Sequence, residues 1–565
     1  MKKLNIVSLF FSLAVTAGFT SCNDFLDENN QNGRYDGEIV WDNPKLAEGV
    51  LLKAYQLMVN DYTEKYDYGT DDMVTNISTD NTITMATGGW TSRNSPFAND
   101  YSKAYQAIMH INDFLANMKK VDFAPLSDES VKEDYQERLR GEAYALRAWW
   151  QAKLLTEFGG IGKDDNLLGF PIMKEVIKEV EDARLPRNTY AECVQQILLD
   201  CDEALKTLPL RWEGDDRVWG SSNKNRINGL TVMALKSRVL LTAASPAFAQ
   251  SGYTMEEAAK AAAAVMKEVG KTENLDPKGL TFYSLGTNNT DYLDSNDEVF
   301  WYSSIAASYN RETRMFPPSL FGQGEINPSQ NLVDCFPMKN GYPIDDEQNS
   351  NFDPANPFKD RDPRLDLFIY HDGSKVAGIH NISLTFTSGL DAIGGNVYST
   401  RTGYYMRKLL DENVKLDKGL ETSTNHYHVR MRYTEVLLNF AEAANEVGPD
   451  TPIEGYTARA VINAIRNRAG ITSTDYVDGL DQAGLAELIK NERRIELCFE
   501  GFRFWDLRRW MDTEKMNENI KGFNSSTKTE IDNVETRKYE DYMIYAPIPF
   551  SETEIYDIIQ NKGWE

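Results

Sequence analysis

Cysteine is scarce, with five residues in a chain of 565. Cys193 and Cys201 lie eight positions apart in a helical pattern, so roughly 12 Å of helix rise separates them, too far for a disulfide. Cys22, Cys335 and Cys498 are widely spaced, and the total is odd. The sequence therefore indicates neither a disulfide framework nor a zinc site.

Histidine is equally scarce, again with five residues. His426 and His428 could place two imidazoles on one face of a strand, which permits a metal ion, but no third ligand accompanies them. Calcium could be held by the oxygen ligands of Asp291, Asp294, Asn296, Asp297 and Glu298, yet these residues miss the spacing of the common calcium loop. We therefore predict no metal and no cofactor.

Catalytic motifs are missing as well. The chain has no Gly-x-Ser-x-Gly elbow, no phosphate-binding loop and no His-Glu-x-x-His. A glycosidase needs a pair of carboxylates, and with 86 acidic residues any chosen pair is uninformative. We predict that the protein is not an enzyme.

Positive charge is in deficit, because 60 Lys and Arg face 86 Asp and Glu, a net charge of −26. This balance argues against binding nucleic acid or an anionic membrane surface through general electrostatics. It favours neutral or cationic ligands, or serves solubility alone.

Long apolar runs are absent apart from residues 4–19, which are too short to span a membrane comfortably. Lys2 and Lys3 precede this run, and small residues follow it up to Cys22. The pattern predicts a lipoprotein signal peptide over 1–21, with Cys22 acylated after cleavage. An ordinary signal peptide with an incidental cysteine is the alternative. No later segment could span a bilayer, so the mature protein is expected to be anchored rather than integral.

Apolar residues recur at helical spacing in four blocks, which predicts a mainly α protein. The blocks cover about 44–62, 99–158, 188–269 and 430–512. Residues 63–98 and about 275–428 are instead rich in Gly, Asn, Asp, Pro and aromatics, which indicates an irregular region with a few short strands, one of them at 298–302. Loops on a rigid scaffold are a common place for binding sites.

One stretch, Asn491–Trp510, mixes five Arg and four acids with many aromatic and apolar residues. Such a mixture could recognise an anion or nucleic acid, or could lock two helices together around a break at Gly501. The acids nearly balance the Arg, which favours the structural lock. Glu492, Glu496 and Glu500 fall four apart, and Arg493, Arg494 and Arg503 are expected to pair with them or with backbone carbonyls.

The same stretch closely resembles the carboxy-terminal signature of the SusD/RagB family, and Asp362-Pro363-Arg364-Leu365 resembles another segment of it. The resemblance implies a right-handed scaffold of tetratricopeptide-like helix pairs, with residues 22–565 as one domain. It also implies a lipid-anchored outer-membrane protein facing the cell exterior, which captures glycans. Its partner would be a SusC-like TonB-dependent transporter, on which it acts as a lid.

Sugar binding needs aromatic rings that stack on pyranose faces and polar groups that bind hydroxyls. Two loops offer that chemistry, and family members often place a stacking Trp in the first. Gly88 and Gly89 are expected to let Trp90 stand clear of the backbone, with the alternative that Trp90 caps a loop core. The candidate ligand residues are Asp80, Asn81, Trp90, Arg93 and Asn94 in the first loop, and Tyr309 and Arg311 in the second.

Three rival functions stay open at this point. Some relatives capture peptides, so a peptide-binding lid of the RagB type is the first. A surface glycoside hydrolase and a purely structural scaffold for a transporter are the others.

Overall fold

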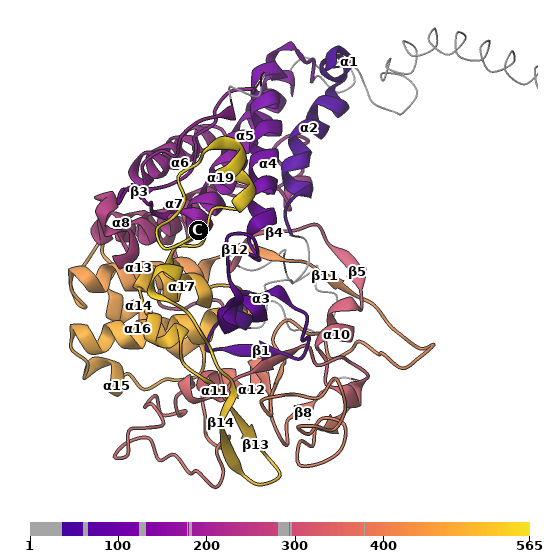
Figure 1. Ribbon diagram of the computed structural model, residues 1–565, viewed down its shortest axis with the longest axis vertical. Helices are drawn as coiled ribbons and strands as arrows, with labels where there is room; N and C mark the ends of the chain where they lie inside the picture. Colours follow the sequence, from indigo (N-terminus) through magenta and orange to yellow (C-terminus); the bar gives the residue numbers. More distant parts are fainter. Residues whose placement is uncertain are drawn as a thin grey trace, which may run out of the picture.

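A computed structural model describes residues 37–59, 66–123, 131–177, 179, 183–280, 293, 297–377 and 379–565 (Figure 1). The predicted signal peptide and Cys22 lie outside these residues. Among the residues described, no helix is long and apolar enough to cross a membrane.

Ten helices of the described residues form the scaffold, and each from α4 to α16 packs against the one before it. They begin at the top of Figure 1 and descend to its lower left, where α13, α14 and α16 form the second half of the array. The helix α8 packs directly on α13, although the irregular region separates them in sequence. The scaffold helices are α2 (Pro44–Gln56), α4 (Ala98–Asn117), α5 (Lys132–Phe158), α6 (Tyr190–Leu205), α7 (Gly229–Ala244), α8 (Met255–Val269), α13 (Tyr433–Val447), α14 (Ala458–Arg468), α16 (Gln482–Leu497) and α17 (Arg503–Trp510).

Local sequence sets the ends and the buried faces of these helices. Thr189 and Thr254 begin α6 and α8 with reciprocal capping boxes, each closed by a Glu three residues later. Gly270 ends α8 in the left-handed conformation, with φ of +72°. The buried face of α8 is mostly alanine, which lets α7 and α13 pack close to it.

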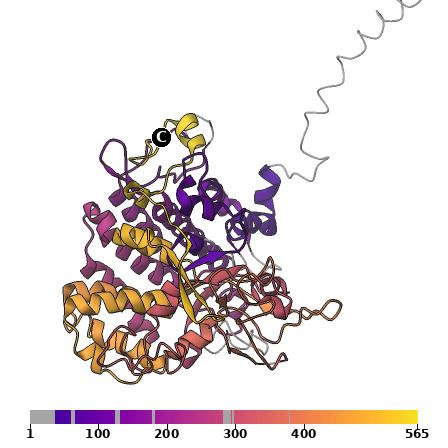
Figure 2. The ribbon, with the colours of Figure 1, turned by 60° about the horizontal axis from the view of Figure 1, so that its bottom comes forward.

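Loops and most of the short antiparallel strand pairs make up the other part of the molecule, at the lower right of Figures 1 and 2. Most strands have only two to four residues, and several pairs join segments that are distant in sequence. The pairs are β1 (Met73–Thr75) with β6 (Ile326–Pro328), β2 (Gly160–Ile161) with β3 (Leu167–Leu168), β4 (Val299–Tyr302) with β12 (Val429–Arg432), β5 (Ala306–Ser308) with β11 (Thr424–His426), β7 (Ile369–Tyr370) with β10 (Tyr405–Met406), β8 (Lys375–Val376) with β9 (Ile382–Ser383), and β13 (Ile520–Asn524) with β14 (Thr529–Glu535).

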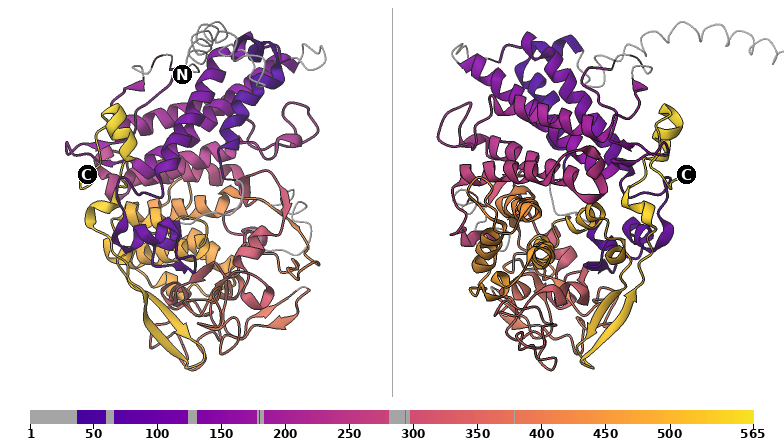
Figure 3. Two further views of the ribbon diagram at one scale, coloured as in Figure 1. Left: turned by 45° about the vertical axis from the view of Figure 1, so that its right-hand side comes forward. Right: turned by 90° about the vertical axis from the view of Figure 1, so that its left-hand side faces the viewer.

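Short helices connect these strands and close the chain. The segment after α17 forms the β13–β14 hairpin and then runs along one side of the molecule to α19, beside the first helices (Figure 3). The connecting helices are α1 (Gly37–Asp42), α3 (Asn81–Thr84), α10 (Asn310–Met315), α11 (Gln330–Cys335), α12 (Pro363–Phe368), α15 (Asp475–Asp478), α18 (Thr513–Met516) and α19 (Phe550–Tyr556).

The fold class is confirmed: the protein is mainly helical, with a large irregular region and short strands. The strand expected at 298–302 is β4. The right-handedness of the array and the treatment of 22–565 as one domain stay predictions.

The stretch Asn491–Trp510 is the structural lock that its charge balance indicated. Gly501, at φ of +80°, lies between α16 and α17. Arg493 bonds Asp506, while Arg494 and Arg503 pair with the buried Asp71 and Asp72, more than 400 residues earlier.

The expected pairing within the stretch is wrong, because its three glutamates have partners elsewhere. Arg364 pairs with both Glu492 and Glu496. The remaining partners are Arg466 for Glu492, Arg468 for Glu496, and Lys408 and Arg432 for Glu500. The lock therefore joins four helices, one strand and two loops instead of closing on itself.

Candidate functional site

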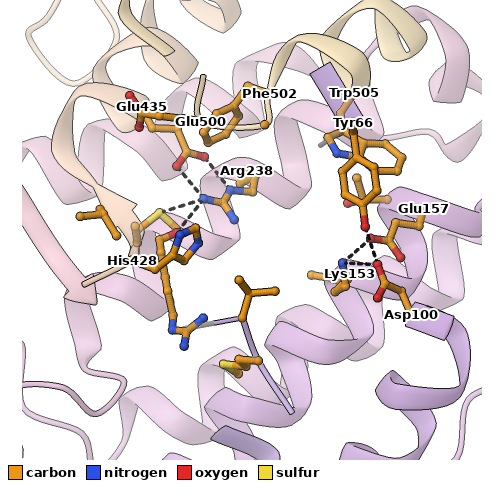
Figure 4. A pocket seen from close by; sticks show the side chains of 18 of the residues that line it. Tyr66, Asp100, Lys153, Glu157, Arg238, His428, Glu435, Glu500, Phe502 and Trp505 are labelled. Atoms are coloured by element: carbon orange, nitrogen blue, oxygen red, sulfur yellow. Dashed lines mark hydrogen bonds and ion pairs between the residues drawn. The ribbon is translucent and has the colours of Figure 1, made fainter. Parts of the chain in front are cut away.

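A pocket of about 790 Å³ opens between the first helices and the C-terminal part of the chain. Helices α4 and α5 supply the side that carries Asp100, Lys153 and Glu157, and α7, β12 and α13 supply the side around Arg238 and Glu435. Its volume lies within the range of sites for small ligands. Figure 4 shows two groups of side chains facing one another across the space.

The first wall carries a hydrogen-bonded group of four side chains. The Tyr66 hydroxyl donates to Asp100 Oδ2 at 2.6 Å, and Lys153 Nζ lies 3.2 Å from the same oxygen. Lys153 also forms an ion pair with Glu157, one turn along α5. Two carboxylates thus share one ammonium group on this wall.

The two carboxyls of this wall have opposite pKa shifts. Burial raises the pKa of Glu157 to about 8, and the negative charge of Asp100 adds to that effect. Burial also acts on Asp100, but Lys153 and the Tyr66 hydroxyl outweigh it and lower the pKa of Asp100 below its ordinary value. At neutral pH, Asp100 and Lys153 carry the charges, and Glu157 is mostly protonated.

The second wall is built around Arg238 of α7. Glu435 of α13 accepts from Nε and Nη2 of Arg238, both at 2.6 Å, which fixes the plane of the guanidinium group. The guanidinium carbon lies 5.3 Å from the ring centre of Trp149 and 5.7 Å from that of Phe502. His428 lies beside it in Figure 4.

Four half-buried rings line the pocket: Tyr66, Trp149, Phe502 and Trp505. Tyr66 and Trp505 meet edge to face with centres 5.8 Å apart. Half-buried rings next to carboxylate, ammonium and guanidinium groups can stack on an apolar face of a ligand while its hydroxyls are hydrogen-bonded. This is the arrangement that sugar binding requires.

Three of the residues predicted from sequence line this pocket. Asp80 and Asn81 lie at the start of α3, where Asp80 caps the helix by accepting from the Thr82 amide at 2.8 Å. Arg311 is buried on α10, and its guanidinium group donates to the carbonyls of Leu409 and Tyr427, both at 3.1 Å.

Trp90 lies in the core and not at the pocket. Its ring is 2% exposed and packs against four others, among them Trp564 at 4.9 Å and Phe97 at 5.7 Å. The expectation of an exposed stacking ring is therefore wrong. The cause is Gly89, where a Cβ would lie 2.5 Å from the Thr84 side chain, so the glycine serves a tight turn and does not lift the ring.

The other predicted residues lie outside the pocket. Arg93 is exposed with its guanidinium group over the Phe550 ring, 3.3 Å from the centre, and Asn94 is exposed in the same turn. Tyr309 is 38% exposed at the start of α10. The structure therefore brings Asp80 and Asn81 of the first loop to the same pocket as Arg311 of the second, and leaves Trp90, Arg93, Asn94 and Tyr309 outside it.

Sequence reasoning missed Tyr66, Lys153, Arg238 and Trp505. The first three gave no signal, because they come from separate segments with no local pattern. Trp505 and Phe502 belong to the stretch Asn491–Trp510, for which the charge balance predicts a structural role and no ligand contact. Both functions coexist: the Arg and Glu of that stretch form the lock, and two of its rings face the pocket.

Nothing in the described part of the chain gathers three metal-ligating side chains. His426 is buried and bonds Glu312 at 3.0 Å, and among the described residues no third ligand joins His426 and His428. Asp291, Asp294 and Asn296 of the calcium hypothesis lie outside the described residues, and Asp297 pairs with Lys271. Cys193, Cys201, Cys335 and Cys498 are free thiols.

Two family models match the chain. The model described as "SusD family" matches residues 289–564, and the one described as "Starch-binding associating with outer membrane" matches residues 24–241. A relative, SusD-like protein P38 of Formosa agariphila, is 22% identical over 562 residues, which are 94% of this chain and 96% of that protein.

Solved structures with the same fold include a SusD-like protein of Bacteroides fragilis, with a TM-score of 0.75, 22% identity, and 94% of this chain and 99% of that chain covered. A SusD-like carbohydrate-binding protein of the same species has a TM-score of 0.70 and 20% identity, over 91% and 99%. The surface glycan-binding protein A of Bacteroides fluxus has a TM-score of 0.60 and 20% identity, over 93% and 100%. On the evidence of the two family models, which together match residues 24–241 and 289–564, this protein belongs to the SusD/RagB family.

Proposed function

We propose that the protein is a glycan-binding protein and that the central pocket holds the sugar. The observation that carries the proposal is the set of half-buried rings, Tyr66, Trp149, Phe502 and Trp505, facing hydrogen-bonding groups in one pocket. The family description "starch-binding" and the relatives named for carbohydrate or glycan binding support it. These names describe binding and not a reaction, in agreement with the prediction that the protein is not an enzyme.

Trp505→Ala tests the role of the rings. Removing one stacking surface is expected to weaken glycan binding about tenfold, equivalent to about 1.4 kcal/mol. Glycans are first identified on an array, and affinities are then measured by calorimetry. Trp510→Ala is the matched control, because Trp510 lies on the same helix, is similarly half-buried and does not line the pocket.

Equal weakening by both substitutions, or no effect of Trp505→Ala, would move the site away from the pocket. Each of the three alternative functions predicts a different experimental result. Binding of oligopeptides and of no glycan would favour the peptide-binding alternative, and release of reducing sugar from a bound polysaccharide would establish a hydrolase. A protein that binds no soluble ligand would be a scaffold only.

The proposal extends to location and partner. The description of the family matching residues 24–241 associates it with the outer membrane. We infer that residues 1–21 are removed, that acylated Cys22 anchors the protein facing outward, and that it covers a SusC-like TonB-dependent transporter as a lid. The motif before Cys22 and the family membership support this.

Cys22→Ala tests the anchor in the native host. The substituted protein is expected in the soluble fraction, without a lipid-dependent mass increase, while the unaltered protein stays with the outer membrane. Membrane retention of the unacylated variant would contradict the anchor. Failure of a β-barrel transporter to co-purify with the membrane-bound protein would contradict the lid.

A further inference from the structure

The charge of the pocket is opposite to that of the chain. Nine Lys and Arg but only six Asp and Glu line it. Over the whole sequence the acids lead by 86 to 60. A ligand entering the pocket therefore meets a local surplus of cations on an acidic protein.

Three ion pairs at the pocket are layered, with the cation nearer to the open space. Side chains of Lys103, Lys153 and Arg238 are 48%, 32% and 26% exposed. Their carboxylate partners Asp100, Glu157 and Glu435 are 16%, 3% and 1% exposed. Glu500 is reversed, because its side chain is 13% exposed and those of its partners Lys408 and Arg432 are 0% and 3% exposed. The cations that a ligand can reach therefore include Lys103, Lys153 and Arg238.

Arg238 is held in a geometry that suits an anion. Glu435 accepts hydrogen bonds from Nε and Nη2 of Arg238, and Nη1 of Arg238 has no acceptor among the described residues. The guanidinium group lies against the Trp149 and Phe502 rings, which limits its movement. A fixed, planar guanidinium group with a free N–H favours carboxylate and sulfate oxygens over a hydroxyl, because charge-assisted hydrogen bonds are about twice as strong.

Resting on the glycan-binding function proposed above, we propose that the sugar bound in this pocket is acidic, carrying a carboxylate or a sulfate group that Arg238 and the lysines of α4 and α5 recognise. The protonated state of Glu157 at neutral pH leaves Lys153 with one charged partner instead of two. The net charge of −26 does not prevent this, because distant surface charges are screened beyond about 8 Å at physiological salt.

The test is a glycan array in which every acidic oligosaccharide is printed beside its neutral counterpart: uronates beside their methyl esters, and sulfated sugars beside their desulfated forms. The acidic member of the bound pair is expected to bind at least tenfold more tightly in calorimetry at low salt. That preference is expected to shrink when ionic strength is raised. The two kinds of pair distinguish carboxylate from sulfate.

Two variants assign the preference to the pocket. Arg238→Gln is expected to weaken binding of the acidic member about tenfold and of the neutral member less than twofold. Lys103→Gln is expected to reduce the affinity for the acidic oligosaccharide about threefold and to leave the affinity for the neutral one unchanged. Because Lys103 is 48% exposed, this variant keeps the test valid if Arg238→Gln, which leaves Glu435 without its partner, unfolds the protein. Lys236→Gln is the control, on the same helix as Arg238 but paired with Asp202 away from the pocket.

The outcomes separate this proposal from the function on which it rests. Binding of neutral glycans as tightly as of their acidic counterparts overturns the acidic preference and leaves glycan binding intact. An acidic-to-neutral ratio unchanged in both pocket variants also overturns it. If no glycan of either kind binds, the proposed function itself is wrong.

Discussion

Replacing Arg364 with methionine is expected to cost more stability than almost any other single change in this chain. The Arg364 side chain is fully buried, and it bonds Asp362 Oδ2 at 2.6 Å, Glu492 Oε2 at 2.8 Å and Glu496 Oε1 at 3.0 Å. These carboxylates are at most 1% exposed. Methionine has a similar length, so the change removes charge and hydrogen bonds while retaining most of the volume.

The expected loss of stability depends on which ion-pair partners the three carboxylates retain. Glu492 retains Arg466, and Glu496 retains Arg468, but Asp362 loses its ion-pair partner. Burial raises the pKa of Glu496, but Arg468, Arg364, Arg432 and Lys408 together lower it to about 2, and three of these four cations remain when Arg364 is replaced. Breaking a buried pair and leaving a charge behind costs about 3–5 kcal/mol.

Urea unfolding of the purified protein at pH 7, followed by tryptophan fluorescence, measures this loss. The control is Lys260→Met, which removes a cation from an ion pair whose side chains are more than half exposed, and which should leave stability nearly unchanged because water screens such a pair. A loss below about 1 kcal/mol for Arg364→Met would refute the view that this network holds the lock together.

The remaining predictions concern Trp90 and Glu157. Trp90→Ala is expected to lower the free energy of unfolding by about 3–5 kcal/mol, because it empties a buried aromatic site; unchanged stability with lost glycan binding would restore Trp90 to the ligand site. The pKa of Glu157 is raised from 4.5 to about 8 in the folded protein, so its contribution to stability is complete below about pH 4.5 and is lost as the pH rises through 8. Urea unfolding at pH 6 and pH 9 measures how far the free energy of unfolding falls between these two pH values. The fall is expected to be smaller, by a few kcal/mol, in Glu157→Gln than in the unaltered protein or in the exposed-site control Glu256→Gln. Equal pH dependence in all three proteins would show that Glu157 titrates as an exposed acid does.

The helical scaffold could be predicted from the sequence because its signal is local. Apolar residues recur every three or four positions in α2, α4, α6 and α8, and capping residues mark several of their ends. In the irregular region only β4 was predicted, since a strand of two or three residues is too short to show alternation.

The pocket could not be predicted, because its two walls are assembled from distant segments. Tyr66, Asp100 and Lys153 meet on one wall, and Arg238 and Glu435 on the other, with no motif in common. Net charge could not predict the charges of the pocket for the same reason: a sum over the chain says nothing about which charges a cavity collects. For Trp90 the sequence left two alternatives, because adjacent glycines allow either an exposed or an inward-facing ring, and the structure shows the inward-facing one.

The packing of Trp564 against Trp90 sets an order on folding. Ser92 Oγ donates to the Glu565 carbonyl, and Asp71 binds Arg494 and Arg503, so the first loop is completed by residues that lie more than 400 positions later in the chain. Until those later residues are synthesised, the Asp71 carboxylate lacks its arginine partners, and the Trp90 ring lacks the Trp564 ring that packs against it. Contacts of such long sequence separation slow folding, and a chain cut shortly before residue 560 would leave that loop without its cover.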